Sequence, residues 1–228
     1  MIVHTLIHKK LDQACISAII KREMEETSDP NVLFRGNSLG TKAVDFYMKI
    51  NGLPFLKSTF ADLIENVYKN KENCEIDEGK LEKPEDAKKN AKKLLAYVHQ
   101  FWEAIMNSTD RFPNELKHLF HFVHETASRI FPSHPNSKYL AVSSFLFLRL
   151  LCPSILSPKM FGVYDEHPEG NVSRTLTYIA KTLQNLANLA DFAVKEPHMT
   201  FMNTFISESM ENMKMTIEKF SVIILMTF

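Results

Sequence analysis

Apolar residues recur at intervals of three and four along most of the chain, and no segment alternates apolar and polar residues as a half-buried strand would. This spacing predicts a first helix over residues 2–27. Asp29-Pro30 stops that helix, because a proline disfavours helical geometry in the residue before it. The pattern therefore predicts an all-α fold with no significant sheet.

The same reading places the later helices. Ser38 is positioned to cap a helix that runs to about residue 50 and ends at Gly52, and another helix begins near Pro54. Residues 70–86 form a charged loop. Further helices are expected over residues 87–108, 114–130, 137–152, 172–193 and 198–220.

The chain is expected to fold as a single domain. Its 228 residues suit one large domain, and a 45% share of hydrophobic residues is enough for a substantial core. Residues 1–32 are expected to form an N-terminal helix of the same domain that occupies residues 33–220, with 221–228 as an unassigned apolar tail. No run approaches the roughly 20 apolar residues of a membrane span, and no secretory signal is visible at the start.

Charge and cysteine content exclude some classes of function. Lys plus Arg and Asp plus Glu balance at 27 each, which argues against a general nucleic-acid-binding protein. The three cysteines are scattered, with no Cys-x-x-Cys pair. This sparse, odd set fits a reduced intracellular protein rather than a disulfide scaffold.

A short loop after the first helix carries an isolated cation. In LFRGNSLG, residues 33–40, Arg35 stands between an apolar pair and Gly36, which allows backbone conformations closed to other residues. Pro30 before it and Gly36 after it predict a tight loop that presents Arg35 outward. The alternative is an ordinary solvated arginine.

A second arginine lies in a helix that is otherwise uncharged. Arg149 is the one charged residue between Tyr139 and Cys152, where apolar residues cover nearly the whole circumference, and Pro153 is expected to stop the helix. A buried guanidinium costs several kcal/mol unless its donors are used. We expect Arg149 to tie down a neighbouring loop through backbone carbonyls, or alternatively to pair with a core carboxylate.

The helix expected over residues 172–193 carries a polar stripe on one face. At about 100° per residue, Lys181, Gln184 and Asn188 fall within about 60° of one another. The same side includes Arg174 and Thr177, and also Lys195 if the helix lasts that far. The opposite side carries leucines and an isoleucine: Leu176, Ile179, Leu183, Leu186 and Leu189. Basic and amide groups without an acid suit an acidic partner surface, although most amphipathic helices bind nothing.

Together these segments resemble the catalytic domain of Ras GTPase-activating proteins (RasGAP), the family of neurofibromin and SynGAP. LFRGNSL resembles the family's finger loop, and FLRLLCPSILSP resembles its Phe-Leu-Arg signature followed by a turn. SRTLTYIAKTLQNLANLADFAVKEPHM resembles a third block of the family. The resemblance runs from about residue 33 to residue 220 and implies a single helical RasGAP catalytic domain there.

The resemblance also implies roles for individual residues. Arg35 takes the position of the arginine finger, which enters the active site of a Ras-type GTPase in trans and accelerates GTP hydrolysis. Arg149 takes the position of the second arginine, which braces the finger loop. The positions that match the groove for the switch regions of Ras are Phe147, Leu148, Arg174, Lys181, Gln184, Asn188 and Lys195. Of these, Arg174 is expected to be more structural.

The implied partner is a Ras-family GTPase in its GTP-bound state, and the chain would be a negative regulator of Ras signalling rather than an enzyme with its own active site. GTP and Mg²⁺ would be bound by the partner, so no cofactor of its own is expected. The expected location is cytoplasmic, with recruitment to the inner face of the plasma membrane through modules or partners outside this sequence. Any membrane contact would be peripheral.

Some features depart from this interpretation or compete with it. Gly40 stands where the family usually has Ala, and a Gly early in a helix costs up to about 1 kcal/mol and would loosen the loop.

A non-catalytic GTPase-binding scaffold is the alternative function, but such proteins typically lack the finger arginine. His118, His121 and His124 recur every third residue; 118 and 124 lie about 120° apart and lack a fourth ligand, so no metal site is expected.

Overall fold

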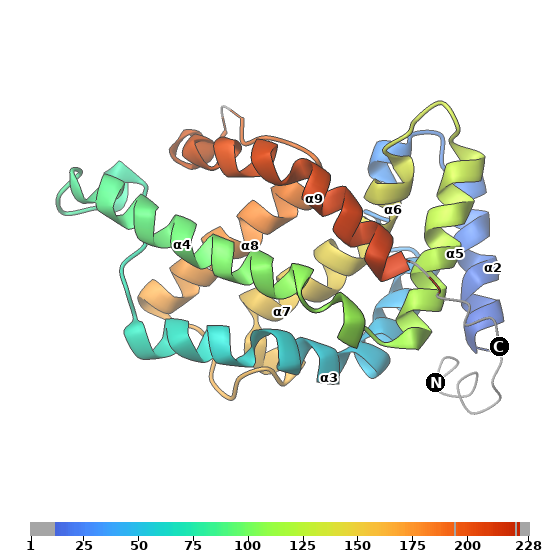
Figure 1. Cartoon of the computed structure of the whole chain (residues 1–228), viewed down its shortest axis with the longest axis horizontal. Helices are drawn as coiled ribbons and strands as arrows, with labels where there is room; N and C mark the ends of the chain where they lie inside the picture. The colour runs from blue at the N-terminus through green and yellow to red at the C-terminus, as the bar shows by residue number, and fades with distance from the viewer. Residues whose placement is uncertain (1–11, 194, 222, 224–228) are drawn as a thin grey trace.

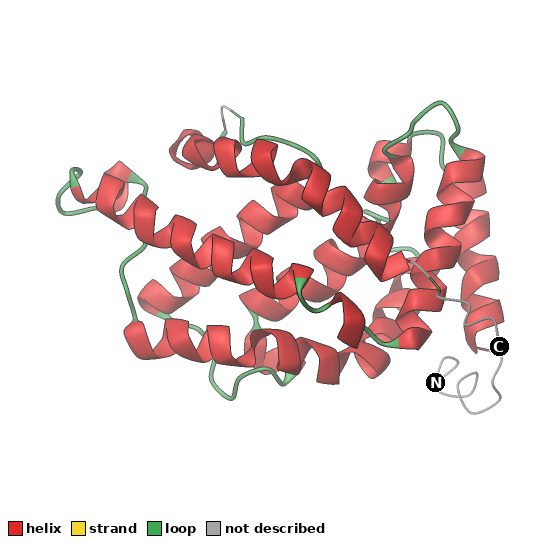
Figure 2. Cartoon of the chain, in the orientation of Figure 1, coloured by secondary structure: helices red, strands yellow, loops and turns green. Residues whose placement is uncertain are grey.

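A computed structural model describes residues 12–193, 195–221 and 223 of the chain (Figure 1). All regular elements within these ranges are helical, and Figure 2 colours no strand among them. The predicted all-α fold is therefore confirmed. Residues 2–11 of the first predicted helix, and residues 222 and 224–228 of the predicted tail, lie outside the described part.

The α-helices, in chain order, are α2 (Asp12–Glu26), α3 (Leu39–Asn70), α4 (Asp86–Met106), α5 (Asn114–Ile130), α6 (Ser137–Phe145), α7 (Cys152–Leu156), α8 (Gly170–Ala187) and α9 (Asn203–Ser221). Between α6 and α7 lies a π-helix, η4 (Leu146–Leu151). The 3₁₀ segments are η1 (Pro30–Val32), η2 (Glu78–Lys80), η3 (Thr109–Arg111), η5 (Pro158–Phe161) and η6 (Pro197–Met202).

The helices pack around one hydrophobic core. Helix α5 contacts α2, α6 and α9. In Figure 1, α2, α5 and α6 gather at one end of the molecule, and α9 crosses the molecule so that its C-terminal end reaches them. At the other end α4 lies against α3 and α8. The buried apolar residues form one cluster that extends from Ile16 of α2 to Phe220 of α9. Helix α2 therefore shares its core with the rest of the chain.

Helix α3 is continuous, so the predicted break between Gly52 and Pro54 is wrong. A Cβ at residue 52 would lie 3.3 Å from Leu150 Cδ2 and 3.4 Å from Leu116 Cδ1, so this glycine permits close packing rather than ending a helix. Pro54 costs about 3 kcal/mol inside a helix. Each buried large apolar side chain contributes roughly 1.5–3 kcal/mol, and several of them lie on the face that continues past Pro54. Tertiary packing outweighs the local signal.

The helical run that contains Arg149 does not end at Pro153 either. It continues through η4 into α7, and Pro153 occupies the first turn of α7, where a missing N–H is tolerated. The run from Ser137 to Leu156 is 20 residues long, and its most apolar 18-residue window has a mean hydropathy of 1.8, enough by length and composition to cross a membrane. The expectation that no segment approaches this limit was wrong. However, 67% of that window is buried inside the protein, so it is weak evidence for a membrane span.

Other boundaries agree more closely with the periodicity. Helix α5 has the predicted bounds, and α4 differs by one residue at its start and two at its end. Helix α8 ends at Ala187, earlier than the predicted residue 193. Leu189 adopts a left-handed conformation with φ 53°, which the helix cannot continue through.

Candidate functional site

The loop that carries Arg35 bends at Phe34. Phe34 has φ 58°, is only 2% exposed, and packs its ring centroid 4.4 Å from that of Phe145 at the end of α6. The next residue, Arg35, is exposed. Because the bend turns Phe34 inward, it leaves Arg35 on the surface, as the sequence predicted.

Phe34 was missed by the sequence interpretation, which assigned the unusual backbone conformation to Gly36. Gly36 has no positive φ, and a Cβ built on it would meet nothing within 4 Å. A left-handed conformation is strained for an aromatic residue, by about 1–3 kcal/mol. Burial of the Phe34 ring offsets that strain. A phenylalanine offers no sequence signal for a positive φ, so only the structure could identify it.

The loop ends in a side-chain cap. The Thr41 amide donates to Ser38 Oγ at 3.0 Å, which confirms the predicted cap of α3. Thr41 Oγ1 donates back to the Gly36 carbonyl at 3.1 Å, and Ser38 Oγ donates to Glu23 of α2. A Cβ at Gly40 would lie 2.7 Å from Glu23 Oε2. Gly40 therefore lets α2 approach the loop closely, whereas the expected loosening of the loop stays a prediction.

Arg149 lies behind the loop, with its side chain 11% exposed. Its Nη2 donates to the Phe34 carbonyl at 2.8 Å and to the Gly36 carbonyl, and its Nε also reaches Phe34 at 3.3 Å. Nη1 donates to Asp45 Oδ2 at 3.1 Å. The two alternatives drawn from the sequence, loop carbonyls and a carboxylate, are both present. The carbonyls on either side of Arg35 are thus held by one guanidinium.

The two residues that precede Arg149 in the π-helix η4 differ in exposure. Leu148 is half-buried and so remains open to a partner. Phe147 is fully buried, so the prediction that it contacts a partner is wrong for its side chain. On a π-helix the turns are wider than the α-helical wheel assumes, and such segments are frequent at functional sites.

Helix α8 presents the predicted stripe next to the loop. Lys181 is exposed, whereas Gln184 and Asn188 are half-buried. On the opposite side, the predicted residues Leu176, Ile179, Leu183 and Leu186 are buried. Leu189, which was predicted on the same side, lies beyond the end of α8. Asn188 Oδ1 accepts a hydrogen bond from Arg35 Nη2 at 3.3 Å. Arg35 and the stripe therefore meet at one place on the surface.

Two members of the stripe differ from the prediction. Lys195 is exposed but lies beyond the end of α8 at Ala187, so the condition for its place on the helical wheel, that the helix lasts that far, is not met. Lys181 forms an ion pair with Glu196, so the stripe is not free of acids in space. A cavity of about 140 Å³ lies beside this pair, lined in part by Gln184 and Phe192. Periodicity could not reveal Glu196, because it lies outside the helix.

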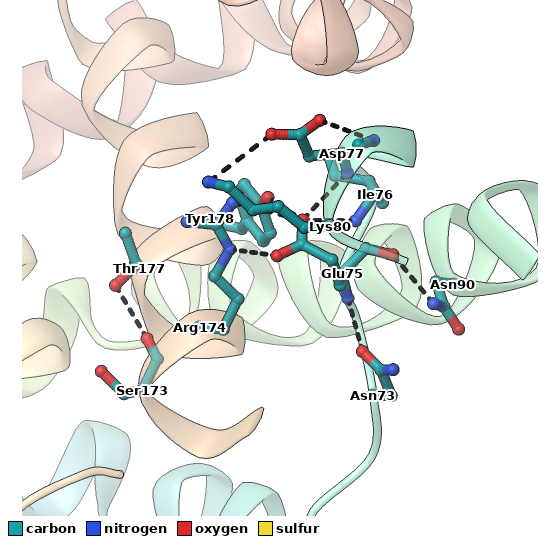
Figure 3. Close-up of polar contacts among 11 residues, drawn as sticks. Asn73, Glu75, Ile76, Asp77, Lys80, Asn90, Ser173, Arg174, Thr177 and Tyr178 are labelled. Carbon is teal, nitrogen blue, oxygen red and sulfur yellow. Dashed lines mark hydrogen bonds and ion pairs between the residues drawn. The ribbon is translucent and has the colours of Figure 1, made fainter. Parts of the chain in front are cut away.

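Arg174 is turned to a different partner. Figure 3 shows it against Glu75, with Arg174 Nε 2.7 Å from Oε2 and Nη2 3.2 Å from Oε1. The guanidinium also lies over the Tyr178 ring, 4.4 Å from its centroid. With its guanidinium occupied in this way, Arg174 is not positioned for the predicted partner contact. It ties α8 to the loop between α3 and α4.

Glu75 is the centre of this second cluster and was also missed. Its carboxylate accepts from the Tyr178 hydroxyl and from the backbone amides of Ile76 and Asp77, in addition to Arg174 (Figure 3). Burial alone would raise the pKa of Glu75, but these hydrogen bonds outweigh it and lower the pKa to about 2. Glu75 is one of several acids in a charged loop, so nothing in the sequence singles it out.

Two of the three histidines of α5 have different neighbours. His121 Nδ1 lies 3.0 Å from the Ser221 carbonyl, and His124 packs against Tyr139. Burial lowers the pKa of His124. No group of three or more His, Cys, Asp or Glu side chains placed to hold a metal ion occurs among the residues that the structure describes.

The sequence of this chain is similar to those of known GTPase-activating proteins. The family model described as GTPase-activator protein for Ras-like GTPase matches residues 15–88 and 78–188. A probable Ras GTPase-activating-like protein, ngap, from Dictyostelium discoideum is 43% identical over 209 residues, 91% of this chain and 24% of that protein.

Two animal proteins are similar over comparable lengths. Ras GTPase-activating protein gap-2 from Caenorhabditis elegans is 38% identical over 93% of this chain and 18% of its own length. Ras GTPase-activating protein 1 from Homo sapiens is 31% identical over 96% of this chain and 21% of its own length. The chain thus spans about a fifth to a quarter of the length of these curated relatives.

Proposed function

The chain belongs to the RasGAP family, and from that premise we propose that it accelerates GTP hydrolysis by a Ras-type small GTPase, with Arg35 entering the GTPase's active site in trans. One observation carries the proposal. Arg35 is exposed at a bend whose two flanking carbonyls, those of Phe34 and Gly36, are both held by the buried Arg149. This arrangement presents a cation on a rigid support.

The chemistry needs such a cation. Negative charge develops on the phosphate oxygens as the γ-phosphoryl group is transferred, and a guanidinium supplied from outside stabilises it. Arginine fingers in general contribute about 10³–10⁵ in rate, Ras with its activating proteins being the standard case. At about 1.4 kcal/mol per tenfold, this range corresponds to roughly 4–7 kcal/mol. Ordering the loop before docking lowers the entropy that must be lost when Arg35 is inserted.

The docking surface is proposed to lie beside the loop. Its members are Leu148, Lys181, Gln184, Asn188 and Lys195. They are exposed or half-buried, and Asn188 already contacts Arg35. We leave Arg174 out, because Glu75 occupies it. The partner is a Ras-family GTPase in its GTP-bound state.

Other properties follow from this role. GTP and Mg²⁺ are bound by the partner, so the chain supplies an arginine and no cofactor of its own. By returning the GTPase to its GDP-bound state, the protein acts as a negative regulator of Ras signalling in the cytoplasm. Partners or further segments would recruit it to the inner face of the plasma membrane.

A single-turnover GTP hydrolysis assay on Ras and on Rap tests the proposal. The wild-type chain is expected to accelerate hydrolysis by at least one of them, and Arg35→Ala to lose at least about 10³-fold of that acceleration while still binding the GTP-bound form. Arg22→Ala is the matched control, because Arg22 is an exposed arginine on α2 paired with Glu26. Full stimulation by Arg35→Ala would refute the finger assignment, and wild-type binding without acceleration would favour the scaffold alternative.

A further inference from the structure

Asp45 is the acidic partner of the arginine behind the finger loop. It lies in the second turn of α3, and its Oδ2 accepts from Arg149 Nη1 at 3.1 Å. Its side chain is 29% exposed, compared with 11% for Arg149. The pair therefore joins α3 to η4 at a place that solvent reaches poorly.

The three acceptors around Arg149 divide its guanidinium into two sides. Nε and Nη2 face the carbonyls of Phe34 and Gly36. Among the described residues, Nη1 has one hydrogen-bond acceptor, Asp45 Oδ2. Since the guanidinium is planar and its donors are fixed relative to one another, a contact at Nη1 sets the direction of the other edge.

The ion pair is not arranged for maximum stability. Asp45 Oδ1 is buried and has no hydrogen-bond partner in the described structure. Burial raises the pKa of Asp45, and the opposing effects of Arg149 and Lys49 do not cancel this. Removing a charge from water and leaving an acceptor unpaired is unfavourable. A charge kept under these conditions is better explained by geometry than by stability.

We infer that Asp45 is a positioning residue, which holds Arg149 Nη1 so that the opposite edge of the guanidinium grips both carbonyls beside Arg35. Without Asp45, the guanidinium of Arg149 can rotate, and in some orientations it no longer reaches the carbonyls of Phe34 and Gly36 together. The loop then samples conformations that direct Arg35 elsewhere. The catalytic consequence rests on the proposed function, whereas the effect on the loop does not.

Substitution of Asp45 tests the catalytic consequence. Asp45→Ala is expected to lower the saturating single-turnover rate about tenfold, as for loss of one charge-assisted hydrogen bond, and to change the Kd for the GTP-bound GTPase less than about twofold. Asp45→Asn keeps an acceptor for Nη1 and should stay within about threefold of wild type. Asp62→Ala, the same change at an exposed position of α3, is the control and should leave the rate unchanged.

A double-mutant cycle separates positioning from general damage. Once Arg149→Ala has removed the guanidinium, Asp45→Ala should have no further effect on the rate. If the two effects simply multiply, Asp45 does not act through Arg149 and the inference is wrong. Should Asp45→Ala fail to fold, Asp45→Ser replaces it, because serine removes the carboxylate but keeps a polar side chain at this half-buried position.

Amide hydrogen exchange provides a readout that needs no GTPase. The Arg35 amide donates to the Val32 carbonyl at 3.2 Å within the loop. This amide should exchange faster in Asp45→Ala than in wild type, while Asp62→Ala leaves it unchanged. Unchanged exchange in a folded Asp45→Ala variant would overturn the inference. If the wild-type chain accelerates no GTPase, the proposed function fails but the exchange experiment still decides the role of Asp45.

Discussion

Two arginine–carboxylate pairs join distant segments of this chain, and they are built differently. Arg149 and Asp45 are 104 residues apart and lie behind the finger loop, while Arg174 and Glu75 are 99 residues apart and lie between α8 and the loop before α4. In the second pair both carboxylate oxygens accept hydrogen bonds. In the first pair one carboxylate oxygen is buried without a donor, and most of the guanidinium serves backbone carbonyls.

This difference separates support of the fold from support of a loop. The Glu75 cluster is saturated, so removing a member leaves several groups unpaired and should mainly affect stability. Arg149 serves the carbonyls of Phe34 and Gly36, so removing it should mainly affect what the loop does. Substitutions at the two pairs should therefore separate stability from activity.

The largest effect is expected at the tip of the loop. Arg35→Lys should lose about 10³-fold of the stimulated single-turnover rate, because an ammonium cannot bridge oxygens as a planar guanidinium does. The free energy of unfolding should not change, since Arg35 is exposed. Urea titration measures the stability and the hydrolysis assay measures the rate. A lysine variant that keeps more than half of the stimulation would contradict the prediction.

The next effect should fall on stability alone. Glu75→Ala should lower the free energy of unfolding by about 3 kcal/mol, because Arg174 and the Tyr178 hydroxyl lose their acceptor in a partly buried site. The rate with saturating GTPase should remain near wild type. Glu78→Ala, in the same loop, is the control, since Glu78 is exposed. A large loss of rate at full stability would remove the distinction between the two pairs.

The same residue should make stability depend on pH. Because the pKa of Glu75 is lowered to about 2 in the folded chain, its stabilisation is complete above the unfolded pKa of about 4.5. It is lost as the pH falls from about 4.5 towards 2, and it amounts to at most about 3 kcal/mol. In Glu75→Gln, the free energy of unfolding should fall less steeply over this window. Urea titrations at several pH values measure the slope, and equal slopes would contradict the assignment.

Removal of the brace should have a smaller effect on rate than removal of the finger. Arg149→Ala should lower the stimulated rate about tenfold to a hundredfold, as for loss of one or two charge-assisted hydrogen bonds. The Kd for the GTP-bound GTPase should change little, because Arg149 lies behind the loop. Arg129→Ala serves as the control at an arginine near the end of α5. Wild-type rates in Arg149→Ala would remove its assigned role.

The smallest effects concern the two glycines that flank the cap. Gly36→Ala should change the free energy of unfolding by less than about 0.5 kcal/mol, since its Cβ meets nothing within 4 Å. Gly40→Ala should lower it by about 1 kcal/mol, because its Cβ would lie 2.7 Å from both Glu23 Oε2 and Ile19 Cγ2. Thermal unfolding compares the two variants directly. Equal stability in both would mean that α2 moves away without cost.

Much of the fold could be predicted from local patterns, but the exceptions have a common cause. The bounds of α5 follow from its periodicity, and the Ser38 cap follows from residue type. The predicted breaks at Gly52 and Pro153 failed because contacts with other helices kept the run helical. The left-handed conformation of Phe34 was missed for the same reason, since a tertiary contact with the ring of Phe145 supports it.

The sequence by itself determined that this chain is helical, that Arg35 is exposed, and that Arg149 lies in an uncharged and largely buried segment. Only the tertiary structure decided the partners of the charged side chains. Asp45 joins Arg149, Glu75 occupies Arg174, and Glu196 pairs with Lys181. Helical periodicity reports neighbours three or four residues away, whereas these partners lie on other elements. Which arginine is available to a partner therefore depends on how the helices pack.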